Sequence, residues 1–263
     1  MTEHADVPST PATPVPPPTD AGEWLAAATV DAALFDLRPD YRALLLTADG
    51  LRGGESDPMS ERILTDAEAT ARRLLGGRSP EQLPHPAAWR EAYRAFGAKP
   101  QRTRPSVEAL LRRLDHGGLP RIDRITDVYN AVSVAHLLPI GGEDRAAYVG
   151  PARLVRAEGS ESFDTTAGGE PTVEHPDPGE VIWRDDTGAT CRRWNWRQCT
   201  RTRITTGTSS ALFILDALDP LTDDAVHEAA DALTAALLEL SPDATIHRRL
   251  LAHPHLTAGG TPC

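Results

Sequence analysis

Helix-type and strand-type patterns occupy separate parts of this chain, and their order restricts the fold more than any other feature. Apolar residues recur every three or four positions within residues 85–139 and again within residues 222–240, as in amphipathic helices. Residues 150–218 instead hold short apolar runs bounded by Gly, Asp and Pro, which is typical of strands. We therefore predict fold class α/β (mixed α+β), a layered domain whose strand-rich centre is flanked by helices.

The predicted helices have recognisable ends and faces. They are expected over residues 66–77, 85–97, 104–118, 125–139 and 222–240, the last with Val226, Ala230, Leu233, Leu237 and Leu240 on one face. Gly97 is expected to close the second helix. Thr126 suits the N-cap of the fourth, and Pro139 its stop. Asn130 and Ser133 share one face of that fourth helix, so they either line a pocket or satisfy buried backbone groups.

Composition divides the rest of the chain. Strands are expected over residues 41–51, 152–157, 179–186, 189–196 and 211–218, with residues 23–35 as a further strand-rich piece. Gly188 lies between two of them and predicts a hairpin with a positive φ at that glycine. The expected segments are a disordered Pro-rich tail (1–20), an N-terminal extension packed on the core (21–82), the main domain (83–245) and a C-terminal tail (246–263).

The sequence also indicates where the protein works. No apolar stretch is long enough to span a membrane, and the N-terminus lacks the basic-then-apolar order of a secretory signal. We therefore expect no membrane contact and a cytoplasmic location. The formal net charge of -11 argues against a general nucleic-acid coat, although it permits a local basic patch.

One stretch, CRRWNWRQCTRTR at residues 191–203, holds five arginines in this acidic chain. If it is extended, one side carries Cys191, Arg193, Asn195 and Arg197, and the other carries Arg192, Trp194, Trp196 and Gln198. The first row would then bind a phosphate or carboxylate through two-pronged arginine contacts, with the indoles buried behind it. The alternative is an internal ion-pair ladder with Asp185, Asp186 and Glu180 on the adjoining strand. Spacing alone leaves both open.

The chain shows neither a metal-ligand pattern nor a nucleophile motif. Cys191 and Cys199 are eight residues apart without a neighbouring Cys or His pair, whereas zinc sites use close ligand spacings. We expect no metal, no cofactor and two reduced thiols, with the Cys191 pKa lowered by the charge of Arg193. Ser133 and His136 are three residues apart on a helix, but an orienting acid is missing, so no catalytic triad is indicated.

Four segments, GAKPQRTRPSVEALLRRL, VYNAVSVAHLLPIGGED, GEVIWRDD and CRRWNWRQCTRTRIT, together resemble a known family. The chain is similar to the standalone B3/4 domain proteins, which resemble the editing domain of the bacterial phenylalanyl-tRNA synthetase β subunit. The resemblance runs from about His85 to Leu240 and leaves residues 1–80 mostly outside. It implies a B3/4-type fold.

The resemblance is incomplete where the synthetase domain does its chemistry. Asn130, Pro139 and Asp144 match the synthetase pattern. Gly141 stands where the synthetase has its active-site histidine, and the glutamate that reads the tyrosine hydroxyl falls near Arg203. The resemblance therefore implies the fold and the ester chemistry, but not the recognition of tyrosine.

The activity implied by the resemblance is that of a trans-acting deacylase, which hydrolyses the ester of a mischarged or non-proteinogenic aminoacyl-tRNA. The expected partner is the aminoacyl-tRNA 3′ end, with no DNA. Asn130 and Ser133 are the expected catalytic residues, because they would hold a water near the ester. The expected substrate-binding residues are His136, Gly141, Asp144, Glu180, Trp183, Arg193, Asn195, Arg197 and Arg203. The alternatives are an aminoacyl-tRNA-dependent transferase in specialised metabolism and a non-catalytic tRNA or amino-acid binding module.

Overall fold

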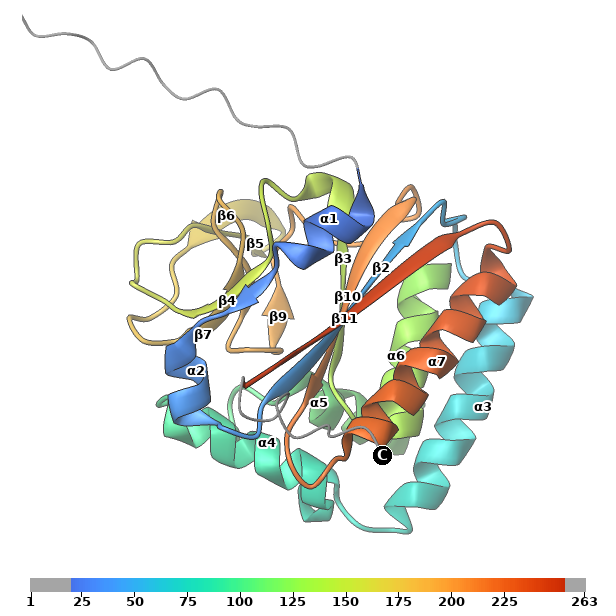
Figure 1. The fold of residues 1–263 in the computed structure, drawn as a ribbon. Coiled ribbons are helices and arrows are strands. Elements are labelled where there is room, and N and C mark those ends of the chain that lie inside the picture. The colour runs from blue at the N-terminus through green and yellow to red at the C-terminus, as the bar shows by residue number, and fades with distance from the viewer. Residues whose placement is uncertain (1–19, 254–263) are drawn as a thin grey trace, which may run out of the picture.

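An antiparallel four-stranded sheet of order β11-β2-β10-β3 forms the middle of the fold (Figure 1). The computed structural model describes residues 20–253. The strands of this sheet are β2 (Arg42–Asp49), β3 (Ile140–Asp144), β10 (Ser210–Ala217) and β11 (Thr245–Ala252). The predicted strands over residues 41–51 and 211–218 are confirmed, and they lie side by side as the two central strands.

Three helices cover one face of this sheet, on the right in Figure 1. They are α3 (Pro58–Leu75), α6 (Arg124–His136) and α7 (Asp223–Leu240). Alternate residues of the central strands, among them Leu44 and Phe213, pack against Val128 of α6 and Leu233 of α7. The apolar face predicted for α7 is confirmed, since its five predicted residues are all buried. This layer leaves the other face of the sheet for a second set of elements.

The opposite face packs against a five-stranded sheet and short helices, on the left of Figure 1. The order of that sheet is β1-β4-β7-β8-β9, with bounds Thr29–Val30, Arg153–Arg156, Val181–Arg184, Ala189–Arg192 and Arg197–Gln198. The remaining elements are α1 (Ala21–Ala26), α2 (Ala32–Leu37), α4 (Pro84–Ala95), α5 (Ser106–Arg113), the hairpin of β5 (Phe163–Ala167) with β6 (Glu170–Glu174), and three 3-10 helices at Pro80–Gln82, Leu114–His116 and Arg145–Ala147. The architecture is thus α+β, as predicted.

The N-terminal part differs from the sequence prediction. Residues 23–35, expected to be strand-rich, form α1 and α2 with only the two-residue β1 between them. The reason is capping: the Asp20 side chain accepts from the backbone N–H of Glu23, and Asp31 does the same for Ala33. Residues 21–82 also supply β2 to the central sheet. The predicted boundary between residues 82 and 83 stays a prediction.

The C-terminal part differs as well. Residues 246–252, expected to belong to a tail, are part of β11, which is hydrogen-bonded to β2 along its whole length. The apolar residues Leu250 and Leu251 contribute to the two cores on either side of the sheet, which explains the pairing. The predicted tail over residues 1–20 and the end of the chain from residue 254 lie outside the described residues, except Asp20. Across residues 20–253, the helices are too short or too polar to cross a membrane.

Two local predictions are wrong in their details. Helix α6 is capped by Asp123 rather than Thr126, because the Asp123 carboxylate accepts from both the backbone N–H and the hydroxyl of Thr126. The hairpin of β7 and β8 forms as predicted, but Gly188 does not have a positive φ. A Cβ on Gly188 would lie 2.3 Å from the carbonyl oxygen of Ser162. The glycine therefore permits a close approach of two backbones rather than a special turn.

Candidate functional site

A pocket of about 210 Å³ opens between the two sheets and is closed on one side by α5 and α6. Its walls combine apolar, amide and carboxyl side chains from distant parts of the chain. The lining residues are Ser106, Ala109, Leu110, Arg113, Tyr129, Asn130, Ile140, Gly141, Glu143, Trp183, Cys191, Trp194, Asn195, Trp196, Arg197, Gln198, Ile214 and Asp216. We call it the inter-sheet pocket. A mostly apolar concavity with a few polar groups is the usual form of a small-molecule site.

The first of its two buried carboxyls is Asp216, in β10. Its Oδ1 accepts a hydrogen bond of 2.6 Å from the Tyr41 hydroxyl, and its Oδ2 accepts one of 3.3 Å from the Asn195 amide. The Asn195 oxygen in turn accepts from the Tyr93 hydroxyl at 2.9 Å. Burial raises the pKa of Asp216 to about 7, although both hydrogen bonds oppose this rise. A carboxyl with this pKa exchanges a proton readily at neutral pH.

The second buried carboxyl is Glu143, in β3. Its Oε2 accepts from the hydroxyls of Tyr148, at 2.6 Å, and Thr202, at 2.9 Å. Its Oε1 is buried and has no hydrogen-bond partner among the described residues. Burial raises the pKa of Glu143 to about 7 as well. Buried polar atoms are rarely left unpaired in proteins, so this oxygen is a position where a ligand donor would be accommodated.

The register of the sheet explains why both carboxyls face the pocket. Glu143 is paired with Leu212, and Gly141 with Ile214, so these four residues lie on one face of the sheet. Asp216 is two residues beyond Ile214 and therefore shares that face. Glu143 lies opposite Leu212, which is four residues from Asp216 along β10. The backbones of Glu143 and Asp216 are therefore about 14 Å apart along the strand direction. The carboxyls thus mark two ends of the pocket and do not form a pair.

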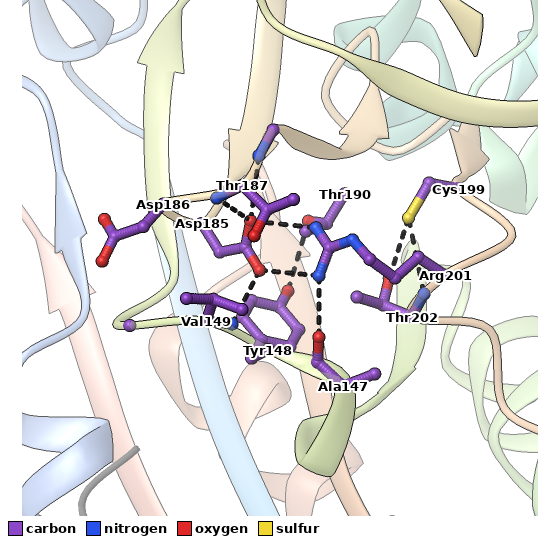
Figure 2. Close-up of polar contacts among 12 residues, drawn as sticks. Ala147, Tyr148, Val149, Asp185, Asp186, Thr187, Thr190, Cys199, Arg201 and Thr202 are labelled. Carbon is purple, nitrogen blue, oxygen red and sulfur yellow. Dashed lines mark hydrogen bonds and ion pairs between the residues drawn. The ribbon is translucent and has the colours of Figure 1, made fainter. Parts of the chain in front are cut away.

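Figure 2 shows the polar network next to Glu143, in which the hydroxyl of Tyr148 also contacts that of Thr190. At its centre the fully buried Asp185 pairs with the partly buried Arg201, with guanidinium–carboxylate distances of 2.8 and 2.9 Å. Asp185 additionally accepts from three backbone N–H groups, those of Val149, Thr187 and Gly188. This carboxylate is saturated, so it supports the loops that hold the Glu143 partners and has no capacity left for a ligand.

Two indole N–H groups in the pocket wall also have no partner. The Nε1 atoms of Trp183 and Trp194 are buried and unpaired within the described part of the chain. Trp194 is fully buried, and its ring makes edge contacts with Tyr41 and Trp89, with centroids 4.9 and 5.3 Å apart. Asn130 of α6 likewise has no side-chain hydrogen bond within residues 20–253. Asn130 therefore gives the pocket an uncommitted amide donor beside its carboxyl acceptors, and two of the other lining residues carry unpaired indole N–H groups.

The arginine-rich stretch is not one extended strand. It is extended only to Arg192, then turns back through Arg193 and Trp194, whose φ values are 49° and 69°, into β9. Most of its guanidiniums are used in ion pairs, and two of the three partners of the ladder alternative, Glu180 and Asp185, take part, whereas Asp186 pairs with Arg153. Arg192 binds the buried Glu180 at 2.8 Å, Arg193 lies 3.4 Å from the same carboxylate, and Arg197 binds Glu174 at 2.8 Å. The predicted alternation of two rows is therefore wrong beyond residue 192.

Residues 88–242, more than half of the chain, match the family model described as "B3/4 domain". The chain belongs to the B3/4 domain family. Among solved structures, it is similar to an N-terminal fragment of the phenylalanyl-tRNA synthetase β subunit from Pyrococcus horikoshii, at 14% identity and a TM-score of 0.43. The match covers 85% of this chain and 53% of that one, so the chain spans about half the length of its structural relative. A search of curated proteins finds no significant match.

The structure of this B3/4 domain protein brings five predicted site residues together in the inter-sheet pocket: Asn130, Gly141, Trp183, Asn195 and Arg197. A Cβ at Gly141 would lie 3.0 Å from the amide nitrogen of Gln198, so the end of the Gln198 side chain would have to shift to admit the histidine of the synthetase pattern. Gln198 itself donates to the carbonyl of Gly142 at 3.1 Å. The Gln198 amide therefore takes up part of the space that a side chain at position 141 would need.

Six other predicted residues lie elsewhere. Ser133 is fully buried and donates to the carbonyl of Leu138 at 2.7 Å, so it satisfies the backbone at the end of α6. Asp144 accepts from Ala146 and Thr208 at the end of β3. The remaining four are His136 at the end of α6, Glu180 and Arg193 in their ion pairs, and Arg203, exposed beside Glu143.

The thiol prediction for this B3/4 domain is also corrected. Cys191 and Cys199 are free and buried. Burial, followed by the charge of Glu143, raises the pKa of Cys191 well above its usual range, whereas a lowered value was expected from Arg193. Arg193 does not share the face of Cys191, because the chain has already turned at that residue.

Sequence reasoning missed the two carboxyls, Asp216 and Glu143, and the tyrosine Tyr41 that donates to the first. One signal was available for Asp216: it falls two and four residues after Ile214 and Leu212, on the buried face of a strand. A carboxyl on an apolar strand face is costly to bury, and such positions are enriched at functional sites.

Proposed function

We propose that this protein hydrolyses the ester bond of an aminoacyl-tRNA in trans, with the aminoacyl group held in the inter-sheet pocket. The observation that carries the proposal is Asp216, a buried carboxyl with a pKa of about 7 that faces a pocket with unpaired donors. The tRNA part of the proposal rests on the sequence resemblance of the B3/4 family to the synthetase editing domain. The pocket supplies two things that ester hydrolysis requires, a base and hydrogen-bond donors.

The ionised form of Asp216 acts as general base. It takes a proton from a water whose oxygen forms a bond to the acyl carbon, and the proton then passes to the ribose oxygen as the ester C–O bond breaks. The products are a free amino acid and a deacylated tRNA. Tyr41 keeps the carboxyl oriented through its 2.6 Å hydrogen bond. The side-chain amide of Asn130 and the indole N–H of Trp194 are the donors that would stabilise the developing oxyanion by hydrogen bonds.

This assignment changes the role expected for Ser133. Its hydroxyl is already committed to the Leu138 carbonyl and does not reach the pocket, so it holds no water for the reaction. Asn130 keeps its proposed role, because its amide lies in the pocket wall. The catalytic set of the proposal is therefore Asp216 with Asn130, supported by Tyr41 and Asn195.

The test is the release of free amino acid from a panel of charged tRNAs by the wild type and by Asp216→Asn. The wild type should accelerate release for at least one tRNA, and the rate should fall on the acid side of a pKa near 7. Asp216→Asn should remove the acceleration, while Asp115→Asn, at an exposed position, should keep it. If no charged tRNA is hydrolysed faster than in buffer, the proposal is wrong. Transfer of the amino acid to another acceptor, or binding without turnover, would point to the two alternatives.

A further inference from the structure

A second concave surface begins at the mouth of the inter-sheet pocket. It has a volume of about 390 Å³ and is lined by Arg102, Arg104, Ala109, Arg112, Arg113 and Trp196. We call it the α5 groove. Ala109, Arg113 and Trp196 line both the groove and the pocket, so the two are continuous. Beyond Arg102 the surface continues into a depression of about 290 Å³ that also includes Lys99.

The cations of this surface are of two kinds. Arg104 and Arg112 lie 3.6 and 3.0 Å from the fully buried Glu108, which also binds Arg90 at 2.8 Å. One carboxylate thus serves three guanidiniums, and only Arg112 has a second carboxylate partner, Glu81. This part of the groove is positive even after its ion pairs are counted.

The second group of cations on this surface has no carboxylate partner among the described residues. The side chains of Lys99, Arg102 and Arg113 form no ion pair or hydrogen bond with any other residue between 20 and 253. The acidic residues in the adjoining depression are Asp177 and Glu180, and both are engaged by Arg193. Unpaired cations along the α5 groove and the depression that adjoins it, in a chain with net charge -11, mark this continuous surface as anion-binding.

The junction of groove and pocket is held by Trp196. The guanidinium carbons of Arg193 and Arg197 each lie 4.7 Å from the centroid of its ring. Such cation–π contacts fix the two guanidiniums in place. Both guanidiniums are already ion-paired, Arg193 with Glu180 and Arg197 with Glu174, so at this junction they position the Trp196 ring rather than add net charge.

We propose that the α5 groove binds the phosphodiester backbone of a single-stranded RNA end whose last residue enters the inter-sheet pocket. This proposal rests on the proposed function and assigns the surface that function requires. Lys99, Arg102 and Arg113 are the phosphate-binding residues, because they have free donors and line the path to the pocket. The acidic remainder of the chain repels nucleic acid elsewhere, so binding is confined to this path.

The experiment measures binding of an uncharged, fluorescently labelled single-stranded RNA of about 12 nucleotides, a length in the range that one single-strand binding module covers. Anisotropy gives the affinity as a function of salt concentration. Three phosphate contacts predict a slope of log K against log salt of about -2, since each contact contributes about -0.7 for single strands. The change to Ala at Lys99, Arg102 or Arg113 should weaken binding and lower the magnitude of the slope by about 0.7 each.

The matched control is Arg73→Ala, at an exposed position of α3 on the far side of the central sheet. It should leave affinity and slope unchanged, and circular dichroism should show that all variants are folded. A slope near zero, or groove variants that behave like Arg73→Ala, overturns the proposal. Equal binding of a polyglutamate peptide of matched charge also overturns it, because the groove would then be a general anion surface.

Because the RNA carries no amino acid, this result is separate from the test of hydrolysis. Salt-dependent binding without hydrolysis of any charged tRNA would leave the groove assigned and reject the deacylase. Hydrolysis that is insensitive to the three substitutions would support the deacylase and reject the assignment of the groove.

Discussion

Glu143→Gln should change how the stability of this protein depends on pH. Glutamine has the size of glutamate, and its oxygen still accepts from Tyr148 and Thr202, whose hydroxyls contact the wild-type carboxyl at 2.6 and 2.9 Å. The substitution therefore removes the titration of one fully buried carboxyl while keeping its packing. Asp216 titrates in both proteins, and its effect cancels in the difference between them.

The magnitude follows from the pKa of Glu143, which burial raises from 4.5 to about 7. Between these two values the folded wild type still holds the proton that the unfolded chain has released. Stability of the wild type therefore falls as pH rises through this window. One pKa unit corresponds to about 1.36 kcal/mol, so the loss is about 3 kcal/mol. The glutamine variant should avoid this loss and gain about that much relative to wild type.

Urea unfolding followed by tryptophan fluorescence, at a series of values from about pH 5 to pH 8, gives the free energy of unfolding of both proteins. The difference between them should grow in favour of the variant up to about pH 7 and then level off, because Glu143 is ionised in both the folded and the unfolded wild type above its pKa. Glu91→Gln, on the exposed side of α4, is the matched control for the loss of one carboxyl. A wild-type–variant difference that stays constant with pH would refute the reasoning, because Glu143 would then have the same pKa in the folded and unfolded chains.

Two further outcomes are expected from the pocket walls. Trp194→Ala should destabilise the fold by about 3–5 kcal/mol in urea unfolding, since a fully buried aromatic ring is lost. Trp196→Ala removes a half-buried ring and should cost clearly less stability. Equal losses of stability would contradict this difference in burial. The thiols of Cys191 and Cys199 should react slowly with a thiol reagent at neutral pH in the folded protein and quickly in urea, because burial raises both pKa values; fast labelling of either of these two thiols in the native Cys263→Ser variant, which removes the third cysteine of the sequence, would contradict this.

The helices of this protein are largely readable from its sequence, because burial on one side leaves a periodic pattern. The apolar repeat that predicts residues 222–240 corresponds to α7, whose buried residues pack on the central sheet. Helix α5 likewise lies within the segment predicted for it, and α4 begins one residue before its predicted segment. The short N-terminal helices were missed, since α1 and α2 have six residues each and depend on aspartate caps and tertiary packing more than on periodicity.

The turn in the arginine-rich stretch was not predictable from residue types. Non-glycine residues rarely adopt a positive φ, and two in succession, Arg193 and Trp194, do so here. Their conformation is stabilised by tertiary contacts: Trp194 is buried against Tyr41 and Trp89, and the Arg193 backbone N–H donates to Glu180. A single sequence does not show those contacts, so the alternating pattern of an extended strand was the natural but wrong expectation.

The same limit applies to the pocket. Asn130 was identified from its place on an apolar helix, and it does lie in the pocket wall. Asp216 and Glu143 come from strands that are neighbours only in the folded sheet, at positions where each looks like the end of an apolar run. The two carboxyls line one pocket because the cross-strand register sets them on the same face of the sheet. A single sequence does not show that register.

The position of β2 in the middle of the central sheet has a consequence for how the chain reaches its native state. Asp49 of β2 and Ser210 of β10 are joined by a side-chain hydrogen bond across 161 residues of sequence, and β11 lies still further along. Contacts of such long sequence separation form slowly, because a large loop must close before any pairing is gained. During synthesis on the ribosome, β2 emerges early and meets its first neighbour only after residue 210 has appeared. The apolar side chains of β2, Leu44 and Leu46 among them, therefore lack their cross-strand neighbours for most of translation, which leaves this strand open to non-native association in the nascent chain.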